Sequence, residues 1–265
     1  VLIASSTDTH VDLLTSSAKA GKAILCEKPI DLDLARVDGC WAEVGSLDPL
    51  VMIGFNRRFD PSFKALRDRV QNGELGKLEQ LTITSRDPGP PSAAYIQVSG
   101  GMFRDMTIHD FDIARYIAGD VVAVHAVGAN LVEPEIEKLG DIDAAMITME
   151  AASGALIHIN NSRRSAYGYD QRIEAFGELG MLQAGNQRAT SVSFSGKDAT
   201  EAKDPVMHFF IERYTSAYLA EIDHFVDCVE QKKTPLVNFS DGREALRLAE
   251  AALESMKSGK TVRLD

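Results

Sequence analysis

Residues 1–30, VLIASSTDTHVDLLTSSAKAGKAILCEKPI, contain two short apolar runs on either side of an amphipathic stretch. The apolar runs, residues 1–4 and 23–26, have the length and composition of buried strands in a parallel sheet. Between them, residues 9–21 show helical spacing, begin at a residue that can cap a helix and end at a glycine. Strand, helix and strand in this order predict a parallel α/β sheet with right-handed crossovers.

The sequence pattern changes partway along the chain. After a helix at 33–44 and a strand at 50–55, polar and apolar residues alternate from residue 77 onward, as in a half-buried strand. We therefore predict an α/β protein with an incomplete doubly wound domain over residues 1–54 and an α+β domain with an open, mainly antiparallel sheet over 55–265. The last helix and strand are expected to pack near the first domain. Later strands are expected at 121–131, 143–151, 155–160, 172–176, 181–184 and 261–264, and helices at 56–72, 102–117, 210–231 and 241–257.

Charge and composition exclude several classes of function. The chain has 265 residues, with 28 Lys and Arg against 39 Asp and Glu, so its formal net charge is −11. An acidic protein is a poor match for nucleic-acid backbones or for anionic membrane surfaces. No apolar run approaches the ~20 residues of a membrane-spanning helix. The three cysteines form no CxxC pair and are typical of a reducing compartment, so we expect a cytoplasmic protein that handles a small molecule.

A lysine follows the second predicted strand. The motif Glu27-Lys28-Pro29 stands at the carboxyl end of that strand, and ligands of parallel sheets bind outside these ends. The proline fixes its own φ and favours a turn that presents Lys28 to the crevice. The alternative is a solvated surface lysine, and the tripeptide alone favours that alternative.

The helix expected at 102–117 contains three ionisable residues on one face. Asp105, His109 and Asp112 are spaced i, i+4 and i+7, which places them on the same side of a continuous helix. A carboxylate one turn from a histidine can set the imidazole tautomer and raise its basicity, as general acid–base catalysis near neutral pH requires. The alternative is a helix-start aspartate beside a capped histidine.

The same three residues are a weak metal-binding set. They include one histidine, and no cysteine supports them. Removal of hydride from an alcohol with the help of a lysine and a histidine needs no metal, so we expect none.

Together these motifs resemble the Gfo/Idh/MocA family of nicotinamide-dependent oxidoreductases, and within it the inositol 2-dehydrogenase branch. The resemblance extends over essentially the whole chain, and its most specific part is the Asp105–His109 helix combined with Glu27-Lys28-Pro29. It implies that residues 1–54 are the remainder of an N-terminally truncated Rossmann domain that binds a dinucleotide. Residues 55–265 would form a domain for substrate binding and oligomerisation. The matching segments are residues 7–10 (TDTH), 27–29 (EKP), 56–60 (NRRFD), 101–112 (GMFRDMTIHDFD), 167–177 (YGYDQRIEAFG) and 213–225 (RYTSAYLAEIDHF).

The resemblance also implies a reaction. Lys28, Asp105 and His109 would form a catalytic trio that oxidises a ring hydroxyl of myo-inositol to a ketone and passes the hydride to NAD. His109 would accept the hydroxyl proton, Asp105 would orient His109 and bind a substrate hydroxyl, and Lys28 would stabilise developing negative charge on the reacting oxygen.

Further contacts follow by similarity. The remaining hydroxyls of a small polyol are assigned to Arg58, Asp87 and Tyr167, with a surface charge and a loop-turn residue as the alternatives for the first two. An apolar free face of the antiparallel sheet would explain assembly into homodimers or homotetramers. The cofactor is assigned to Thr7, His10, Glu27, Lys28 and Pro29.

The chain departs from the family pattern at the cofactor motif. It contains no G-x-G-x-x-G turn and no acidic residue after a second strand to bind the ribose. We therefore expect about the first quarter of the parent domain to lie outside this sequence, and we expect NAD as the cofactor while leaving NADP open. Two other functions stay open: a dehydrogenase of another cyclitol or sugar, such as scyllo-inositol or an aldose, and a non-catalytic sugar-binding relative. The presence of Lys28, Asp105 and His109 disfavours the second.

Overall fold

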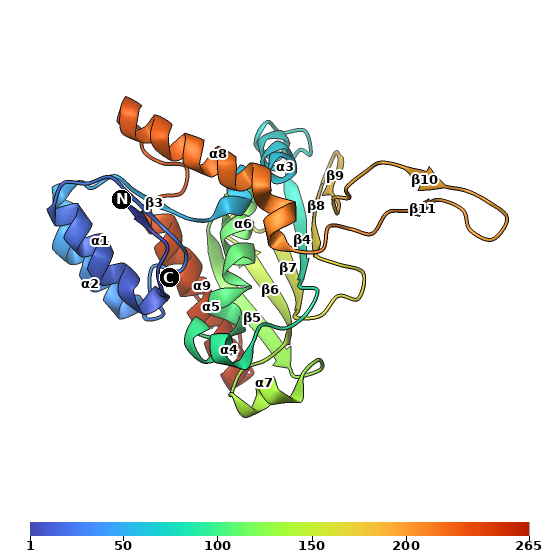
Figure 1. Cartoon of the computed structure of the whole chain (residues 1–265), viewed down its shortest axis with the longest axis horizontal. Helices are drawn as coiled ribbons and strands as arrows, with labels where there is room; N and C mark the ends of the chain where they lie inside the picture. The colour runs from blue at the N-terminus through green and yellow to red at the C-terminus, as the bar shows by residue number, and fades with distance from the viewer. Residues whose placement is uncertain (265) are drawn as a thin grey trace.

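The computed structural model describes residues 1–264, which form a small parallel sheet and a larger, mainly antiparallel one (Figure 1). The small sheet has the order β1-β2-β3, with all strands parallel. Its connections are α1 (His10–Lys19) and α2 (Leu34–Val44), and the Asp33 side chain caps α2 by accepting from Ala35 N. This confirms the predicted strand–helix alternation. The strands are β1 (Leu2–Ile3), β2 (Ile24–Cys26) and β3 (Val51–Ile53).

The larger sheet has seven strands in the order β12-β5-β6-β7-β4-β8-β9. Every neighbouring pair is antiparallel except β4 with β7. The predicted open, mainly antiparallel sheet is therefore confirmed. Its strands are β4 (Leu78–Arg86), β5 (Val121–Ala129), β6 (Ala144–Ala151), β7 (Leu156–Ser162), β8 (Asp170–Gly177), β9 (Gly180–Ala184) and β12 (Val262–Arg263).

The two faces of this sheet differ because side chains alternate along each strand. One face presents buried residues such as Ile83, Ile147 and Ile159 to the helices, with α6 (Ile108–Ala118) packed on β4 and α9 (Phe239–Ser258) on β5. No helix covers the other face in Figure 1. Large apolar side chains are exposed on that open face, namely Val127, Met146, Leu156, Phe176 and Met181.

Helix α9 joins the two sheets. Its first residue, Phe239, stacks on Trp41 of α2 with ring centroids 4.4 Å apart. A Cβ at Gly242 would lie 2.7 Å from Ile30 Cδ1, so a larger residue would push α9 away from the small sheet. The last helix thus packs against the first part of the chain, as expected, whereas β12 pairs with β5 of the large sheet. The domain boundary at residue 54 stays a prediction.

The helix expected at 102–117 is broken, which corrects the sequence prediction. The structure has α5 (Met102–Asp105), a turn, and then α6, preceded by a short helix α4 (Ala93–Ser99) that the sequence pattern did not reveal. In the turn, the buried Thr107 hydroxyl donates to Asn161 Oδ1 at 2.7 Å instead of facing solvent. Because the helix restarts, Asp105 and Asp112 no longer share a face.

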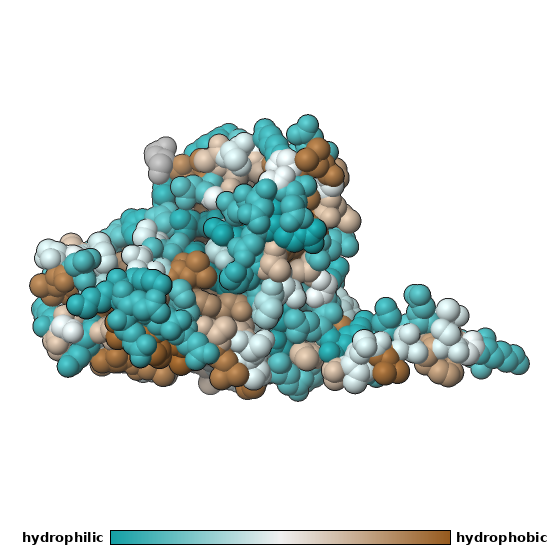
Figure 2. Space-filling model, turned by 90° about the horizontal axis from the view of Figure 1, so that it is seen from above, coloured by the Kyte–Doolittle hydropathy of each residue, from teal (hydrophilic) through white to brown (hydrophobic). Residues whose placement is uncertain are grey.

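The remaining elements complete the connections. A hairpin of β10 (Ser193–Phe194) and β11 (Ala202–Lys203) extends away from the body of the molecule (Figures 1 and 2). Within the described part of the chain, no helix is long and apolar enough to cross a membrane. The other helices are the 3₁₀ turns Thr7–Thr9, Gly45–Leu47 and Asn56–Phe59, and α3 (Pro61–Gln71), α7 (Pro134–Lys138) and α8 (Phe210–Gln231).

Candidate active site

A cavity of about 1220 Å³ lies where the carboxyl ends of the parallel strands face the large sheet and its helices. Loops after β1, β2, β3 and β4 form one side, and α4, α5, α6 and the start of α8 form the other. This volume exceeds that of most small-ligand pockets, which hold about 300–1,000 Å³. The ionisable and aromatic residues that line it include His10, Glu27, Lys28, Arg57, Asp87, Tyr95, Asp105, His109, Arg163, Tyr169, Phe209, Phe210, Tyr214 and Tyr218.

Lys28, Asp105 and His109 all line this single cavity. Lys28 Nζ donates to the main-chain oxygen of Asp105 at 2.7 Å and lies 3.5 Å from Oδ1 of the same residue. The side chains of the pair are 16% and 14% exposed, so their charges interact across a poorly solvated space. An ammonium, a carboxylate and an imidazole are therefore available to one small ligand.

The His109 ring is enclosed at the cavity wall. Desolvation, followed by the positive charges of Lys28 and Arg57, holds the pKa of His109 well below its usual 6.5. The imidazole is therefore neutral at pH 7, as a proton acceptor must be. Its Nδ1 has no hydrogen-bond partner among the described residues. The ring packs edge-on against Phe55, with the two ring centroids 5.8 Å apart. The expected orienting contact from Asp105 is not formed, because the helix break turns Asp105 toward Lys28.

Besides Lys28, groups from two other segments hold the Asp105 carboxylate. Tyr95 of α4 donates its hydroxyl hydrogen to Oδ1 at 2.8 Å, and the Arg163 guanidinium lies 3.7 Å from Oδ2. Arg163 is 1% exposed and also lies 3.4 Å from Oδ2 of Asp141. Neither Tyr95 nor Arg163 was identified from the sequence, since no spacing rule relates them to Asp105.

Arg57 lines the cavity, whereas the sequence assigns its neighbour Arg58 to the substrate. Arg57 Nη1 donates to Asp110 Oδ1 at 2.6 Å and to Ser85 Oγ at 3.0 Å, both buried. Asn161 completes this network by donating to Asp110 Oδ2 at 2.8 Å. The tight 3₁₀ turn over Asn56–Phe59 sends the two consecutive arginines to different sites.

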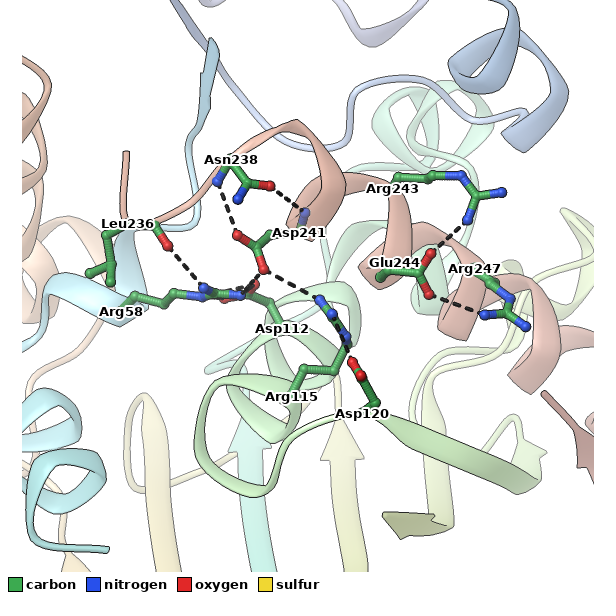
Figure 3. Close-up of polar contacts among 10 residues, drawn as sticks. All are labelled: Arg58, Asp112, Arg115, Asp120, Leu236, Asn238, Asp241, Arg243, Glu244 and Arg247. Carbon is green, nitrogen blue, oxygen red and sulfur yellow. Dashed lines mark hydrogen bonds and ion pairs between the residues drawn. The ribbon is translucent and has the colours of Figure 1, made fainter. Parts of the chain in front are cut away.

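Arg58, which the sequence assigns to substrate, does not line the cavity. Figure 3 shows where its guanidinium lies instead. Its guanidinium binds Asp112 through Nε at 3.0 Å and Nη2 at 2.6 Å. It also donates to Asp241 Oδ1 at 3.0 Å and to the main-chain oxygen of Leu236 at 3.1 Å. Asp112 is fully buried, and by binding both Asp112 and Asp241 the guanidinium ties α6 to the start of α9.

Of the other two residues assigned to the substrate, Asp87 lines the cavity and Tyr167 does not. The Asp87 carboxylate has no hydrogen-bond partner among the described residues, and desolvation raises its pKa to about 6 against the opposing charges of Arg163 and Arg57. Tyr167 lies outside the cavity, 50% exposed, and its hydroxyl donates to Asp170. Tyr169, two residues later, lines the cavity and is 6% exposed.

The residues assigned to a dinucleotide also lie together. Thr7, His10, Glu27, Lys28 and Pro29 line the side of the cavity formed by the parallel strands. The buried His10 ring contacts Pro29 O at 2.8 Å and Ser5 O at 3.1 Å, which joins the loops after β1 and β2.

The carboxyl ends of parallel strands suit the nicotinamide end of a dinucleotide, and Gly54 suits the close approach of Glu27, whose Oε2 lies 2.9 Å from where a Cβ would stand. The glycine-rich turn that would bind the pyrophosphate is not in this sequence. Among residues 1–264, no group of three or more His, Cys, Asp or Glu is placed to bind a metal.

Comparisons with known proteins agree with this architecture. Residues 1–55 match the oxidoreductase family with an NAD-binding Rossmann fold, and residues 63–183 match the GFO/IDH/MocA C-terminal domain. A myo-inositol 2-dehydrogenase of Thermotoga maritima is 48% identical over 266 residues, which covers 100% of this chain and 79% of the relative.

Solved structures give the same result. A myo-inositol dehydrogenase from Corynebacterium glutamicum superposes with a TM-score of 0.97 at 50% identity, covering 100% of this chain and 79% of that one. A scyllo-inositol dehydrogenase from Lactobacillus casei, solved with NAD(H) and scyllo-inositol bound, superposes with a TM-score of 0.90 at 26% identity. The match covers 99% of this chain and 79% of that one. The chain therefore belongs to the GFO/IDH/MocA family of oxidoreductases, whose N-terminal part is an NAD-binding Rossmann fold.

Proposed function

We propose that this chain is the catalytic part of an NAD-dependent dehydrogenase that oxidises a ring hydroxyl of myo-inositol to the ketone 2-keto-myo-inositol (scyllo-inosose). The observation that supports this most directly is the meeting of Lys28, Asp105 and His109 in one cavity. Relatives named as myo-inositol dehydrogenases support the substrate, since they are 48% and 50% identical to this chain.

His109 is the proton acceptor in this proposal. Its imidazole is neutral at pH 7 because desolvation and the charges of Lys28 and Arg57 disfavour the imidazolium. A neutral imidazole beside a bound hydroxyl can take the hydroxyl proton as the C–H bond breaks. NAD, when bound beside Thr7, Glu27 and Pro29, supplies the hydride acceptor.

Lys28 and Asp105 act as a pair. The ammonium of Lys28 stabilises negative charge that develops on the reacting oxygen, and a poorly solvated site makes this stabilisation large. Asp105 keeps the ammonium in place through its main-chain oxygen and its carboxylate. The same carboxylate can accept a hydrogen bond from a substrate hydroxyl.

Recognition of the other hydroxyls is assigned to Asp87, Arg57 and Tyr169. The Asp87 carboxylate has no hydrogen-bond partner in the described part of the chain, and Arg57 and Tyr169 replace Arg58 and Tyr167 of the sequence-based assignment. Sites that hydrogen-bond each hydroxyl reject analogues that lack one, so this set would select a polyol.

We also propose that the protein assembles as a homodimer or homotetramer in the cytoplasm. Two observations support this: the open face of the large sheet exposes Met146, Leu156 and Phe176, and the three cysteines are all free. Contiguous apolar surface of this kind is typical of an interface between subunits. Met146→Glu is expected to lower the mass measured by analytical ultracentrifugation.

The closest competing functions are oxidation of scyllo-inositol or an aldose, and sugar binding without catalysis. The scyllo-inositol dehydrogenase among the structural relatives supports the first. The test is reduction of NAD by a panel of cyclitols and aldoses, in protein with a complete dinucleotide-binding region. We expect the highest kcat/KM with myo-inositol. Bound NAD and bound polyol without NADH formation would instead favour the binding protein.

A further inference from the structure

Tyr95 reaches into the proposed active site from a segment that carries no predicted function. It lies on α4, in the connection between β4 and α5; the residue is 47% exposed, and its hydroxyl donates a hydrogen bond to Asp105. Residues 89–92 and 97–99 of the same connection also line the cavity. The connection is therefore one wall of the site, and Tyr95 links this wall to the proposed catalytic carboxylate.

The bond from Tyr95 is unique among the contacts of the Asp105 carboxylate. Lys28 Nζ lies 3.5 Å from Oδ1, and its hydrogen bond goes to the main-chain oxygen of Asp105. The Arg163 guanidinium lies 3.7 Å from Oδ2. Within residues 1–264, the Tyr95 hydroxyl makes the one hydrogen bond to this carboxylate, at 2.8 Å. The two cations thus neutralise Asp105 without fixing its rotation, whereas Tyr95 does fix it.

The Tyr95 hydroxyl is suited to be a permanent donor. Desolvation and the nearby Asp105 carboxylate raise its pKa above the usual value of 10, so the phenol keeps its proton over the working pH range. Its backbone is held too: Ser92 caps α4 by accepting from Tyr95 N, and the buried Ile96 anchors the helix.

The link between α4 and α5, Gly100-Gly101, also has a restricted conformation. Gly100 and Gly101 both have positive φ, and a Cβ at Gly100 would lie 2.5 Å from Leu32. The tyrosine is therefore presented to Asp105 in one direction.

We propose that Tyr95 is a positioning residue for the dehydrogenase reaction: its hydroxyl bond to Oδ1 sets the orientation in which Asp105 meets Lys28 and the substrate. This inference rests on the proposed function, since it gives Tyr95 its effect through the catalytic carboxylate. It predicts that the phenol acts on turnover and not on substrate affinity, because the ground-state contacts of the polyol with Asp87 and Arg57 remain.

The test is a double-mutant cycle with Tyr95→Phe and Asp105→Asn in the full-length enzyme, with NAD and myo-inositol. In the wild-type background, Tyr95→Phe is expected to lower kcat by about tenfold while KM changes by less than about twofold, as for a lost hydrogen bond to a charged group. In the Asp105→Asn background the same substitution should change kcat by less than about twofold, because the acceptor charge is gone.

Tyr116→Phe is the matched control. The Tyr116 ring lies under Arg58, outside the cavity, and its hydroxyl has no hydrogen bond among the described residues, so kcat and KM should both stay unchanged. Three outcomes would overturn the inference: an unchanged kcat, a rise in KM alone, or the same loss of kcat in both backgrounds. Wild-type enzyme that oxidises no cyclitol would refute the proposed function, and the inference with it.

Discussion

Lys28 and Asp105 make two contacts with each other, although 77 positions separate them in the chain. The lysine ammonium donates to the aspartate main-chain oxygen at 2.7 Å and lies 3.5 Å from the carboxylate. This contact joins the end of β2 in the parallel sheet to α5, which packs against α6 and α9, the helices that cover the large sheet. The cavity exists because the two halves of the fold meet here, so changes on either side are expected to affect the same chemistry.

Replacement of His109 removes the proposed proton acceptor. His109→Ala is expected to lower kcat about 10²–10⁴-fold, the usual contribution of a general base, while substrate affinity changes little. The measurement is steady-state NADH formation together with calorimetric binding of the polyol. His208→Ala, at an exposed position outside the cavity, is the control and should keep wild-type activity. Full activity of His109→Ala would contradict the assigned role.

Replacement of Lys28 should change both the rate and its pH dependence. Lys28→Met removes the charge beside the reacting oxygen, so kcat should fall about 10²–10³-fold. Because Lys28 is one of the causes that lower the pKa of His109, the acidic limb of the kcat/KM profile should move upward toward pH 6.5.

The profile is measured between about pH 5 and 9, with exposed Lys22→Met as the control. An acidic limb that stays in place would show that His109 is not the titrating group.

Arg58 is expected to matter for stability and not for substrate binding. Arg58→Met leaves the fully buried Asp112 without its main partner, so the free energy of unfolding should fall by about 3–5 kcal/mol. Urea denaturation measures this, with Arg243→Met at a partly exposed pair as the control, expected to cost no more than about 1 kcal/mol. The KM of the folded Arg58→Met enzyme should match the wild type, whereas Arg57→Met should raise it. The reverse pattern would restore Arg58 as a substrate contact.

Glu221 on α8 should make the protein less stable as the pH rises. It is 3% exposed, its Oε1 has no hydrogen-bond partner within residues 1–264, and burial together with the charge of Glu27 raises its pKa to about 8. The folded state therefore keeps a proton that the unfolded chain loses near pH 4.5. The contribution of Glu221 to the free energy of unfolding is therefore fully present below pH 4.5 and is lost as the pH rises through about 8.

Glu221→Gln keeps the shape of the side chain and removes this titration. We expect its free energy of unfolding to exceed that of the wild type by about 2–4 kcal/mol near pH 9, and to equal it near pH 4. Glu230→Gln, exposed on the same helix, should show no such pH-dependent gain. A wild-type stability that is flat between these pH values would contradict the assignment.

Local pattern was sufficient to identify much of the fold. The apolar run at Ile24–Cys26 and the capped helix from Leu34 follow from burial and capping alone, and the two long helices near the C-terminus follow from helical periodicity. The loop after β2 could be assigned to the site only by combining Glu27-Lys28-Pro29 with the Asp105–His109 segment, since the tripeptide alone favours a solvated surface lysine.

The sequence by itself determined the order of most strands and helices, though not α4 or the break between α5 and α6, because that order depends on short-range spacing. It also determined the family resemblance, and through it the three residues of the proposed trio, because both depend on contiguous motifs. Tertiary structure alone decided that Arg57 and not Arg58 lines the cavity, that Tyr169 and not Tyr167 faces it, and that Tyr95 bonds Asp105. Neighbours two residues apart or less look alike in a sequence pattern. The 3₁₀ turn over Asn56–Phe59 sends Arg57 to Asp110 at the cavity wall and Arg58 to Asp112 outside it, since each buried charge must find a partner in the packed molecule.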